Sequence, residues 1–461
     1  MCAAMTEAAP SPRPQPAGYR WLVLLACSVA MFGNYYVFDA LYPVTPLLEK
    51  AFGFTGEQVG LLDTAYNVAA LLTLLAGGVL IDRLGTARSS VLFGAIGAAG
   101  TLLIAFGPVL TPGTPALGMA AGRFVLGVGS ELFIVAATTV VGRWFKGKEI
   151  SFALAIQLLI ARFGSLAADQ SPNFAGGLFE RGWQAPLLLA GVLGVAWFVF
   201  AVIYAGLEAN AARRYGVKGT VATDKLVLGD LVRFDRAYWW VVGLCVAFYA
   251  TIFPFRTFAN LFFIDYRGLT NEAAGSLKSV LPLLSMIGMP LFGLLADKFG
   301  KRALMMAAGS ALLVPPFLLM LWWHTGVVLP EVRLPLLGTV LAAGTPLELV
   351  LAMAMMGLAF ALVPAVLWPA VTYLVPGSRL GSAYALMTFC QQVGWAGMSW
   401  GMGKVKDAGH ASAAAPGGWV PVVLMLAVLS SAGFVFSFLL WRSERGAGAH
   451  GLEDVTPREH A

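Results

Sequence analysis

The stretch GVLIDRLGTAR at residues 78–88 returns as GLLADKFGKR at residues 293–302. Both copies place a glycine, an aspartate, a basic residue and a second glycine at the same spacing, 215 positions apart. Each copy ends one long apolar run and precedes another. The two copies therefore indicate a chain built from two related halves.

The repeat extends far beyond these two stretches. Beyond the segment 327–344 the offset grows to 230, so the extra residues fit an insertion in the second half. The matched pairs include Thr55/Thr270, Gly60/Gly275, Gly127/Gly357 and Gly164/Gly394. Spans that repeat at this offset would have the same orientation in both halves.

Composition places the chain in a membrane. Of its 461 residues, 59% are hydrophobic and 12% are charged, whereas soluble domains carry about 25% charged residues. These values exclude a soluble enzyme, a nucleic-acid binder and a disordered scaffold. The four cysteines and four histidines show no disulfide or metal-ligand spacing, so we expect no metal, no cofactor and no enzymatic activity.

Twelve apolar segments are long enough to cross a bilayer, which takes about 20 residues each. They lie at 20–43, 56–80, 90–110, 117–142, 150–172, 184–207, 238–263, 272–296, 303–325, 346–374, 380–403 and 419–441. With both termini in the cytoplasm, most lysines and arginines outside the spans fall on the cytoplasmic side, as membrane proteins prefer.

These features predict an all-α integral membrane protein with twelve transmembrane helices in two parallel six-helix repeats, which resembles the major facilitator fold. The predicted parts are a cytoplasmic tail (1–19), a six-helix bundle (20–207), a cytoplasmic linker (208–237), a second bundle (238–442) and a cytoplasmic tail (443–461).

The two stretches at residues 78–88 and 293–302 resemble the loop motif of that superfamily, G-x-L-x-D-R-x-G-R-K. The resemblance implies gating: the motif would hold the inner helix ends together while the outer side is open. Simple helix-end capping is the alternative. The implied gating residues are Gly78, Asp82, Arg83, Gly85 and Arg88 in the first copy, and Gly293, Asp297, Lys298, Gly300 and Arg302 in the second.

Ionisable residues inside the spans are candidates for a functional site, because a charge in the bilayer is costly unless it faces a cavity or a partner. Glu131 and Arg162 lie near the middle of adjacent spans, while other charged residues lie nearer the outer rim, where salt bridges are the alternative role. Helical spacing places Tyr35 with Asp39, and Asp63 with Tyr66, on shared faces. The candidate substrate-binding residues are Tyr35, Asp39, Asp63, Tyr66, Glu131, Arg162, Arg256, Lys278, Trp368 and Gln392.

Glu131 and Arg162 form the most informative pair. They could neutralise each other, or they could hold a zwitterion, with the carboxylate accepting an ammonium and the guanidinium gripping a carboxylate in bidentate fashion. An amino acid or a short peptide fits the second reading.

Several segments are similar to the lysosomal dipeptide transporters of animals and their bacterial relatives. They are GRFVLGVGSE (122–131), WFKGKE (144–149), QLLIARFGS (157–165), YYVFD (35–39) and LWPAV (367–371). The resemblance implies dipeptide transport by facilitated diffusion, with Glu131 at the peptide's amino end and Arg162 at its carboxylate. The animal members work beside a glycosylated partner. This chain has no Asn-x-Ser/Thr sequon of its own, which favours a bacterial plasma membrane.

The expected function is alternating-access uniport of dipeptides or similar small zwitterions. A proton-coupled transporter and an organic-anion exchanger of the same fold are the main alternatives, and a non-transporting sensor is a third. Arginine outnumbers lysine, and alanine and glycine are abundant, which favours the inner membrane of a bacterium. We expect a monomer in the lipid bilayer, without an accessory subunit or nucleic acid.

Overall fold

The computed structural model describes residues 18–145, 149–215, 234–334, 338–376, 379–446 and 449–454. Ten helical segments in this part of the chain are long and apolar enough to cross a membrane. Two further helices of 29 residues each, Gly56–Leu84 and Leu380–Ala408, lie among them. The arrangement is consistent with the twelve spans expected from the sequence.

The helices of the first half follow the predicted segments closely. They are α1 (Tyr19–Asp39), η1 (Tyr42–Val44), α2 (Thr45–Phe52), α3 (Gly56–Leu84), α4 (Thr86–Leu110), α5 (Pro115–Trp144), α6 (Ile150–Phe174), α7 (Gly176–Glu180) and α8 (Gln184–Tyr215). The short helices α2 and α7 were not predicted. Most of the expected linker, 216–233, lies outside the described residues.

The second half repeats this order. Its helices are α9 (Arg236–Asp265), α10 (Asn271–Phe299), α11 (Arg302–Leu312), α12 (Pro315–Trp322), α13 (Leu347–Leu374), α14 (Leu380–Ala408), η4 (Pro416–Gly418) and α15 (Trp419–Ser443). The predicted span 303–325 is broken between α11 and α12, where Pro315 and Pro316 remove backbone donors.

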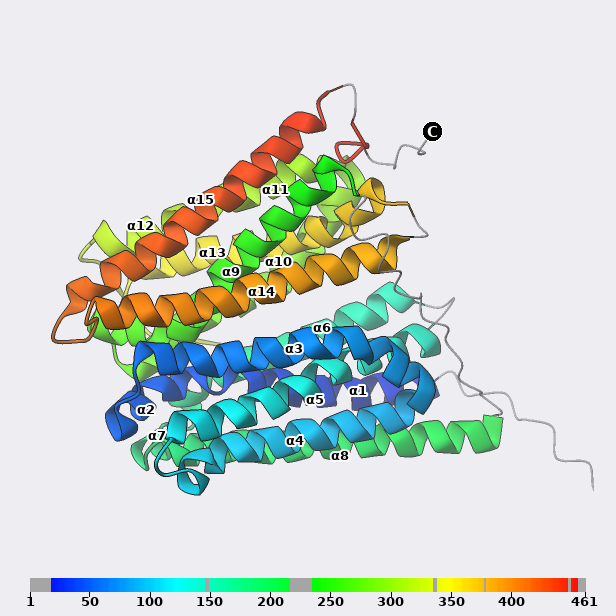
Figure 1. Cartoon of the computed structure of the whole chain (residues 1–461), viewed down its shortest axis with the longest axis horizontal. Helices are drawn as coiled ribbons and strands as arrows, with labels where there is room; N and C mark the ends of the chain where they lie inside the picture. Colours follow the sequence, from blue (N-terminus) through cyan, green and yellow to red (C-terminus); the bar gives the residue numbers. More distant parts are fainter. Residues whose placement is uncertain are drawn as a thin grey trace, which may run out of the picture.

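The helices form two bundles, α1 to α8 and α9 to α15 (Figure 1). We call the end that contains Tyr19, Gly85, Gly300 and Ser443 the terminal face, and the opposite end the loop face. Figure 1 shows α3 and α14 side by side near the loop face, with α14 rising away from α3 toward the terminal face. The bundles are therefore in closest contact at the loop face.

Glycines make that contact possible. A Cβ atom on Gly60 of α3 would lie 2.3 Å from the carbonyl oxygen of Ser399, and one on Gly403 of α14 would lie 2.1 Å from that of Gly56. Small residues allow helix backbones to approach this closely in a membrane. The Asp407 carboxylate also accepts the backbone N–H of Gly56 at 2.6 Å, so α14 supplies a cap for the positive end of α3.

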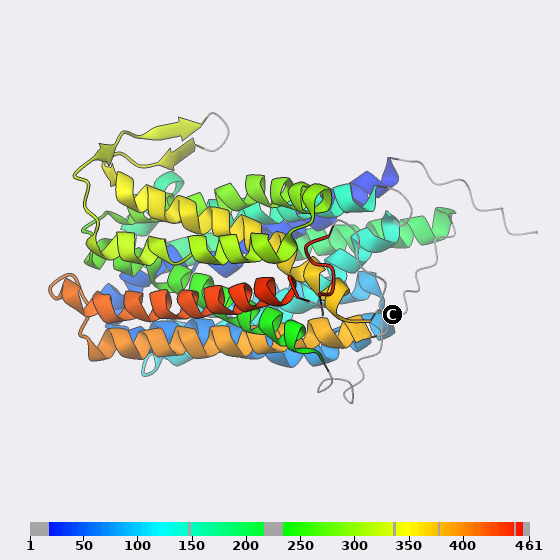
Figure 2. The ribbon, with the colours of Figure 1, turned by 90° about the horizontal axis from the view of Figure 1, so that it is seen from above.

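The predicted insertion forms two short antiparallel strand pairs at the loop face. The pairs are β1 (Val328–Leu329) with β4 (Thr345–Pro346), and β2 (Val332–Leu334) with β3 (Gly338–Leu341). Figure 2 shows them beside the helices, near the loop-face end of the molecule. Gln170 of α6 donates to the carbonyl of Val340, and the N–H of Ala342 donates to Ser276 of α10. The insertion thus bridges the two bundles.

Adding one methyl group at the α3–α14 contact should lower stability. We expect Gly403→Ala to lower the melting temperature of the purified protein, because overpacking a tight contact costs about 1–3 kcal/mol. Gly401→Ala is the matched control on the same helix, since a Cβ atom there would meet nothing within 4 Å. Equal melting temperatures for the two variants would contradict the close approach.

Candidate functional site

A cavity of about 270 Å³ lies between the bundles. Its wall comes from α1, α3, α5 and α6 of the first half and from α9, α13 and α14 of the second. Eight of the ten expected substrate-binding residues line it; Asp63 and Lys278 do not. Both halves therefore meet at one site.

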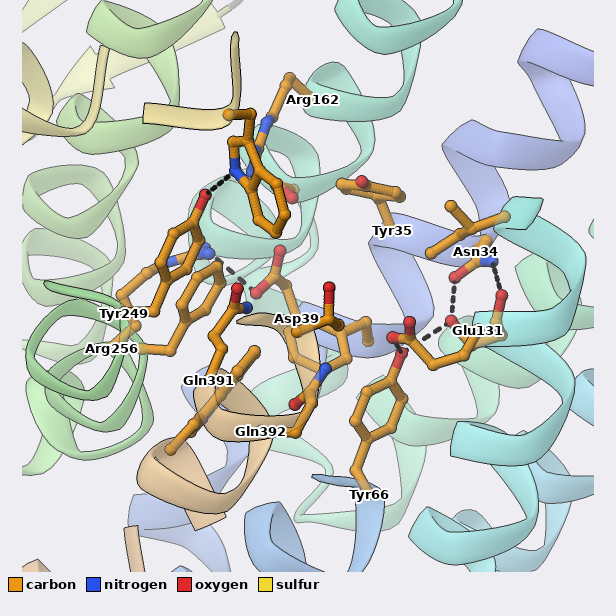
Figure 3. Close-up of a pocket in the computed structure, with 18 residues that line it drawn as sticks. Asn34, Tyr35, Asp39, Tyr66, Glu131, Arg162, Tyr249, Arg256, Gln391 and Gln392 are labelled. Carbon is orange, nitrogen blue, oxygen red and sulfur yellow. Dashed lines mark hydrogen bonds and ion pairs between the residues drawn. The ribbon is translucent and has the colours of Figure 1, made fainter. Parts of the chain in front are cut away.

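Glu131 of α5 occupies one side of this cavity, where a chain of hydrogen bonds orients it (Figure 3). Its Oε1 and the Ser130 hydroxyl each lie 2.8 Å from the Tyr66 hydroxyl. The Ser130 hydroxyl in turn donates to Oδ1 of Asn34 at 2.6 Å. No other hydrogen bond to Glu131 occurs among the described residues, so its second oxygen is available to a ligand.

Arg162 of α6 also faces the cavity. Its guanidinium lies over two aromatic rings, 5.6 Å from the centroid of Tyr35 and 5.1 Å from that of Phe360. In the described part of the chain it has no ion pair, and its Nε is buried without a hydrogen-bond partner. The mutual neutralisation considered for Glu131 and Arg162 does not occur in this structure.

Four other buried charges form ion pairs across the two halves. Arg256 of α9 lies 3.1 Å from Asp39 of α1 and 3.0 Å from Asp169 of α6. Lys278 of α10 lies 3.0 Å from the other oxygen of Asp169. We call these four residues the charge quartet. All are at most 2% exposed, and they join α1 and α6 to α9 and α10.

Asp63 of α3 belongs to a second buried network. It accepts from the indole of Trp395 at 2.7 Å and from the hydroxyl of Ser399 at 2.6 Å, both on α14. Arg123 lies 3.4 Å away on its own half. Asp63 and Lys278 are therefore occupied by protein partners behind the cavity wall, and we do not propose that either touches a ligand.

The second half contributes an aromatic wall. Tyr249 and Phe253 stack at 5.8 Å, and Phe253 stacks on Trp395 at 4.0 Å. The indole of Trp368 donates to the Tyr249 hydroxyl. Sequence reasoning missed Tyr249 and Phe253, although their spacing from Arg256 puts all three on one helical face.

The second copy of the loop motif makes specific contacts at the terminal face. Arg302 pairs with Asp297 at 3.3 Å and lies 4.7 Å from the ring centroid of Tyr373. Gly300 has a φ of +65°, and a Cβ atom on it would collide with the backbone oxygen of Asp454. The C-terminal segment thus packs directly on this loop.

The remaining motif residues make fewer contacts. Lys298 lies over the ring of Phe299, and Gly293 has open space around it. Arg83 and Arg88 are exposed, and Gly85 has a φ of +78°. The side-chain positions at 78 and 82 lie outside the described residues.

Near the first copy, two charged residues outside the motif join neighbouring helices. Arg143 of α5 pairs with Glu208 of α8 at 3.2 Å, and Thr86 donates to the same carboxylate. Among the described residues, no cluster of three histidine, cysteine or acidic side chains is placed to hold a metal ion.

Comparison with known proteins places the fold in a family. The model described as Major Facilitator Superfamily matches residues 27–399. The chain is 28% identical over 406 residues to the protein of Homo sapiens named lysosomal dipeptide transporter MFSD1, a match covering 86% of this chain and 81% of that protein.

Two solved structures share the fold. The nucleoside transporter NupG has a TM-score of 0.65 at 15% identity, covering 91% of this chain and 98% of NupG. A bacterial homologue of the human lysosomal transporter Spinster, in an inward-facing and occupied conformation, has a TM-score of 0.66 at 15% identity, covering 93% and 98%.

Breaking the charge quartet from one side should be strongly destabilising. Asp169→Asn leaves Lys278 buried without an acid, which costs about 3–5 kcal/mol, so we expect a large fall in melting temperature. The double variant Asp169→Asn/Lys278→Met removes both charges and should recover most of the loss. Glu331→Gln, in an exposed pair with Arg333, is the control. A double variant as unstable as the single one would contradict the pairing.

Proposed function

The chain belongs to the Major Facilitator Superfamily, and we propose that it carries dipeptides or similar small zwitterions by alternating access. One observation supports this substrate class more than any other. Glu131 and Arg162, of opposite charge, face the same cavity between the halves without an ion pair between them. A ligand with a charge at each end would satisfy both.

Each charged residue has one role in the proposal. The available oxygen of Glu131 accepts from the ligand's ammonium group, and the guanidinium of Arg162 binds the ligand's carboxylate through two parallel hydrogen bonds. Tyr35 and Phe360 hold the guanidinium in place by cation–π contact. Hydrogen bonds to charged groups contribute about 1.5–3 kcal/mol each, so losing one should weaken binding by about ten- to a hundredfold.

The contrast between the two ends of the molecule supports alternating access. The halves are joined at the loop face by the α3–α14 contact and by the charge quartet. A second cavity of about 370 Å³ adjoins Arg162 and extends between α6 and α10 toward the terminal face, lined mainly by apolar side chains such as Phe152 and Met289. We therefore interpret the conformation as open toward the terminal face.

The transport mode and location are further parts of the proposal. We propose facilitated diffusion in the inner membrane of a bacterium, with the terminal face and both chain ends in the cytoplasm and with the protein acting as a monomer. The rocking of the halves would break and remake the inter-half contacts at the loop face while the site stays near the middle of the membrane.

The amine of the ligand should be essential. In a thermal-shift assay on purified protein, a dipeptide should stabilise the folded state by RT ln(1 + [L]/Kd) and so raise the melting temperature. Its N-acetylated form should not. Glu131→Gln and Arg162→Ala should each weaken dipeptide binding by about ten- to a hundredfold. Val192→Ala, a lipid-facing change on α8 where the side chain is 65% exposed, is the control. We call the pairing of Glu131 and Arg162 with the two charges of the ligand the zwitterion clamp. Equal binding of both ligand forms would refute it.

Facilitated diffusion makes a separate prediction. In proteoliposomes, dipeptide counterflow and net uptake should proceed without a pH gradient, and an imposed gradient should not drive accumulation. Protein-free liposomes provide the control. Accumulation above the external concentration that collapses with the gradient would instead establish proton coupling.

A further inference from the structure

The middle of the proposed ligand offers chemistry that the charged clamp does not use. A dipeptide has a peptide bond between its charged ends, with one N–H donor and one carbonyl acceptor. Glu131 and Arg162, both on the first half, account only for the ends. Groups that match the amide would therefore lie on the wall opposite them.

Two side-chain amides enter the cavity from α14. Gln391 and Gln392 line it and are 7% and 6% exposed, and Figure 3 shows both entering from the same helix, with Gln392 the nearer of the two to Tyr66. Consecutive residues on a helix rarely face one cavity. Both glutamines nevertheless line this one.

Both amides have unused hydrogen-bonding capacity. Oε1 of Gln392 is buried without a hydrogen-bond partner in the described part of the chain, and its Nε2 forms no hydrogen bond there. Among the described residues, Oε1 of Gln391 accepts only from the thiol of Cys245 at 3.5 Å, a weak donor. Buried polar groups are nearly always hydrogen-bonded, so unpartnered amides on a cavity wall indicate a ligand that pairs with them.

Neighbouring polar groups on the same wall are already engaged. The indole N–H of Trp368 donates to Tyr249, and that of Trp395 donates to Asp63. The hydroxyl of Thr388 donates to the backbone oxygen of Tyr384. Besides the Tyr249 hydroxyl, whose own proton forms no hydrogen bond among the described residues, the two glutamines are left as an adjacent donor and acceptor pair on this wall.

We propose that Gln391 and Gln392 recognise the peptide bond of the ligand, one amide accepting its N–H and the other donating to its carbonyl. This inference rests on the proposed function, because the clamp fixes where the middle of the ligand lies. It makes the two glutamines specificity-determining residues. The site then selects a zwitterion with an amide at its centre over one of equal length and charge without it.

Three probes of the same charge and nearly the same length test this selection. They are glycylglycine, its ketomethylene analogue, which lacks the N–H, and its all-methylene analogue, an ω-amino acid that lacks both amide groups. Affinities are measured by calorimetry on the full-length purified protein. We expect affinity to fall at each step, with about a tenfold or greater loss from the first probe to the last, since each net hydrogen bond contributes a factor of several.

Variants of the two glutamines then test whether these residues cause the preference for a ligand with a central amide. In Gln392→Leu, and separately in Gln391→Leu, the affinity ratio of glycylglycine to the all-methylene analogue should fall to below about threefold. A ratio measured on one protein cancels any general loss of stability or of active fraction. Val393→Ala, on the same helix with the side chain 49% exposed, should keep the wild-type ratio.

The outcomes separate this inference from the proposed function. If the wild-type protein binds all three probes equally well, or if neither glutamine variant changes the ratio, peptide-bond recognition is refuted and the zwitterion clamp stands. If the wild-type protein binds none of them, both are refuted. The assignment of peptide-bond recognition to the glutamines is supported if a glutamine variant loses the affinity ratio of glycylglycine to the all-methylene analogue, still binds the latter, and Val393→Ala keeps the ratio.

Discussion

The structure depends on keeping two opposite charges apart inside a membrane. A carboxylate and a guanidinium in a low-dielectric region attract strongly, and an unpaired charge within a span is costly. Glu131 nevertheless accepts a hydrogen bond from Tyr66, and the Arg162 guanidinium lies over the rings of Tyr35 and Phe360. The fold thus keeps both charges without an ion pair, which is the arrangement that the proposed zwitterionic ligand requires.

The other buried charges serve a different purpose. The quartet of Asp39, Asp169, Arg256 and Lys278 is paired within the protein and joins the halves. Asp63 does the same through Trp395 and Ser399. A buried ion pair adds little net stability because desolvation offsets the attraction. Such contacts can therefore hold one conformation without making it irreversible, as the proposed alternating access requires.

The sequence predicted the large features because they are local or periodic. Apolar length located the helices, the internal repeat gave the two halves, and residue counting placed Glu131 and Arg162 at similar depth. It could not predict that Asp63 binds residues more than 300 positions away, because that pairing depends on how the halves dock. Tyr249 and Phe253 were missed because aromatic residues at helical spacing are usually packing residues. The strands near Val328 and Thr345 have only two to four residues each, too few for a periodic signal.

The most direct test of this account is an experimental structure of the protein with a bound dipeptide. The account predicts the ligand's carboxylate within hydrogen-bonding distance of the Arg162 guanidinium and its ammonium within the same distance of Glu131, in the cavity between the halves. A ligand bound elsewhere, or an ion pair between Glu131 and Arg162 with the ligand in place, would contradict it.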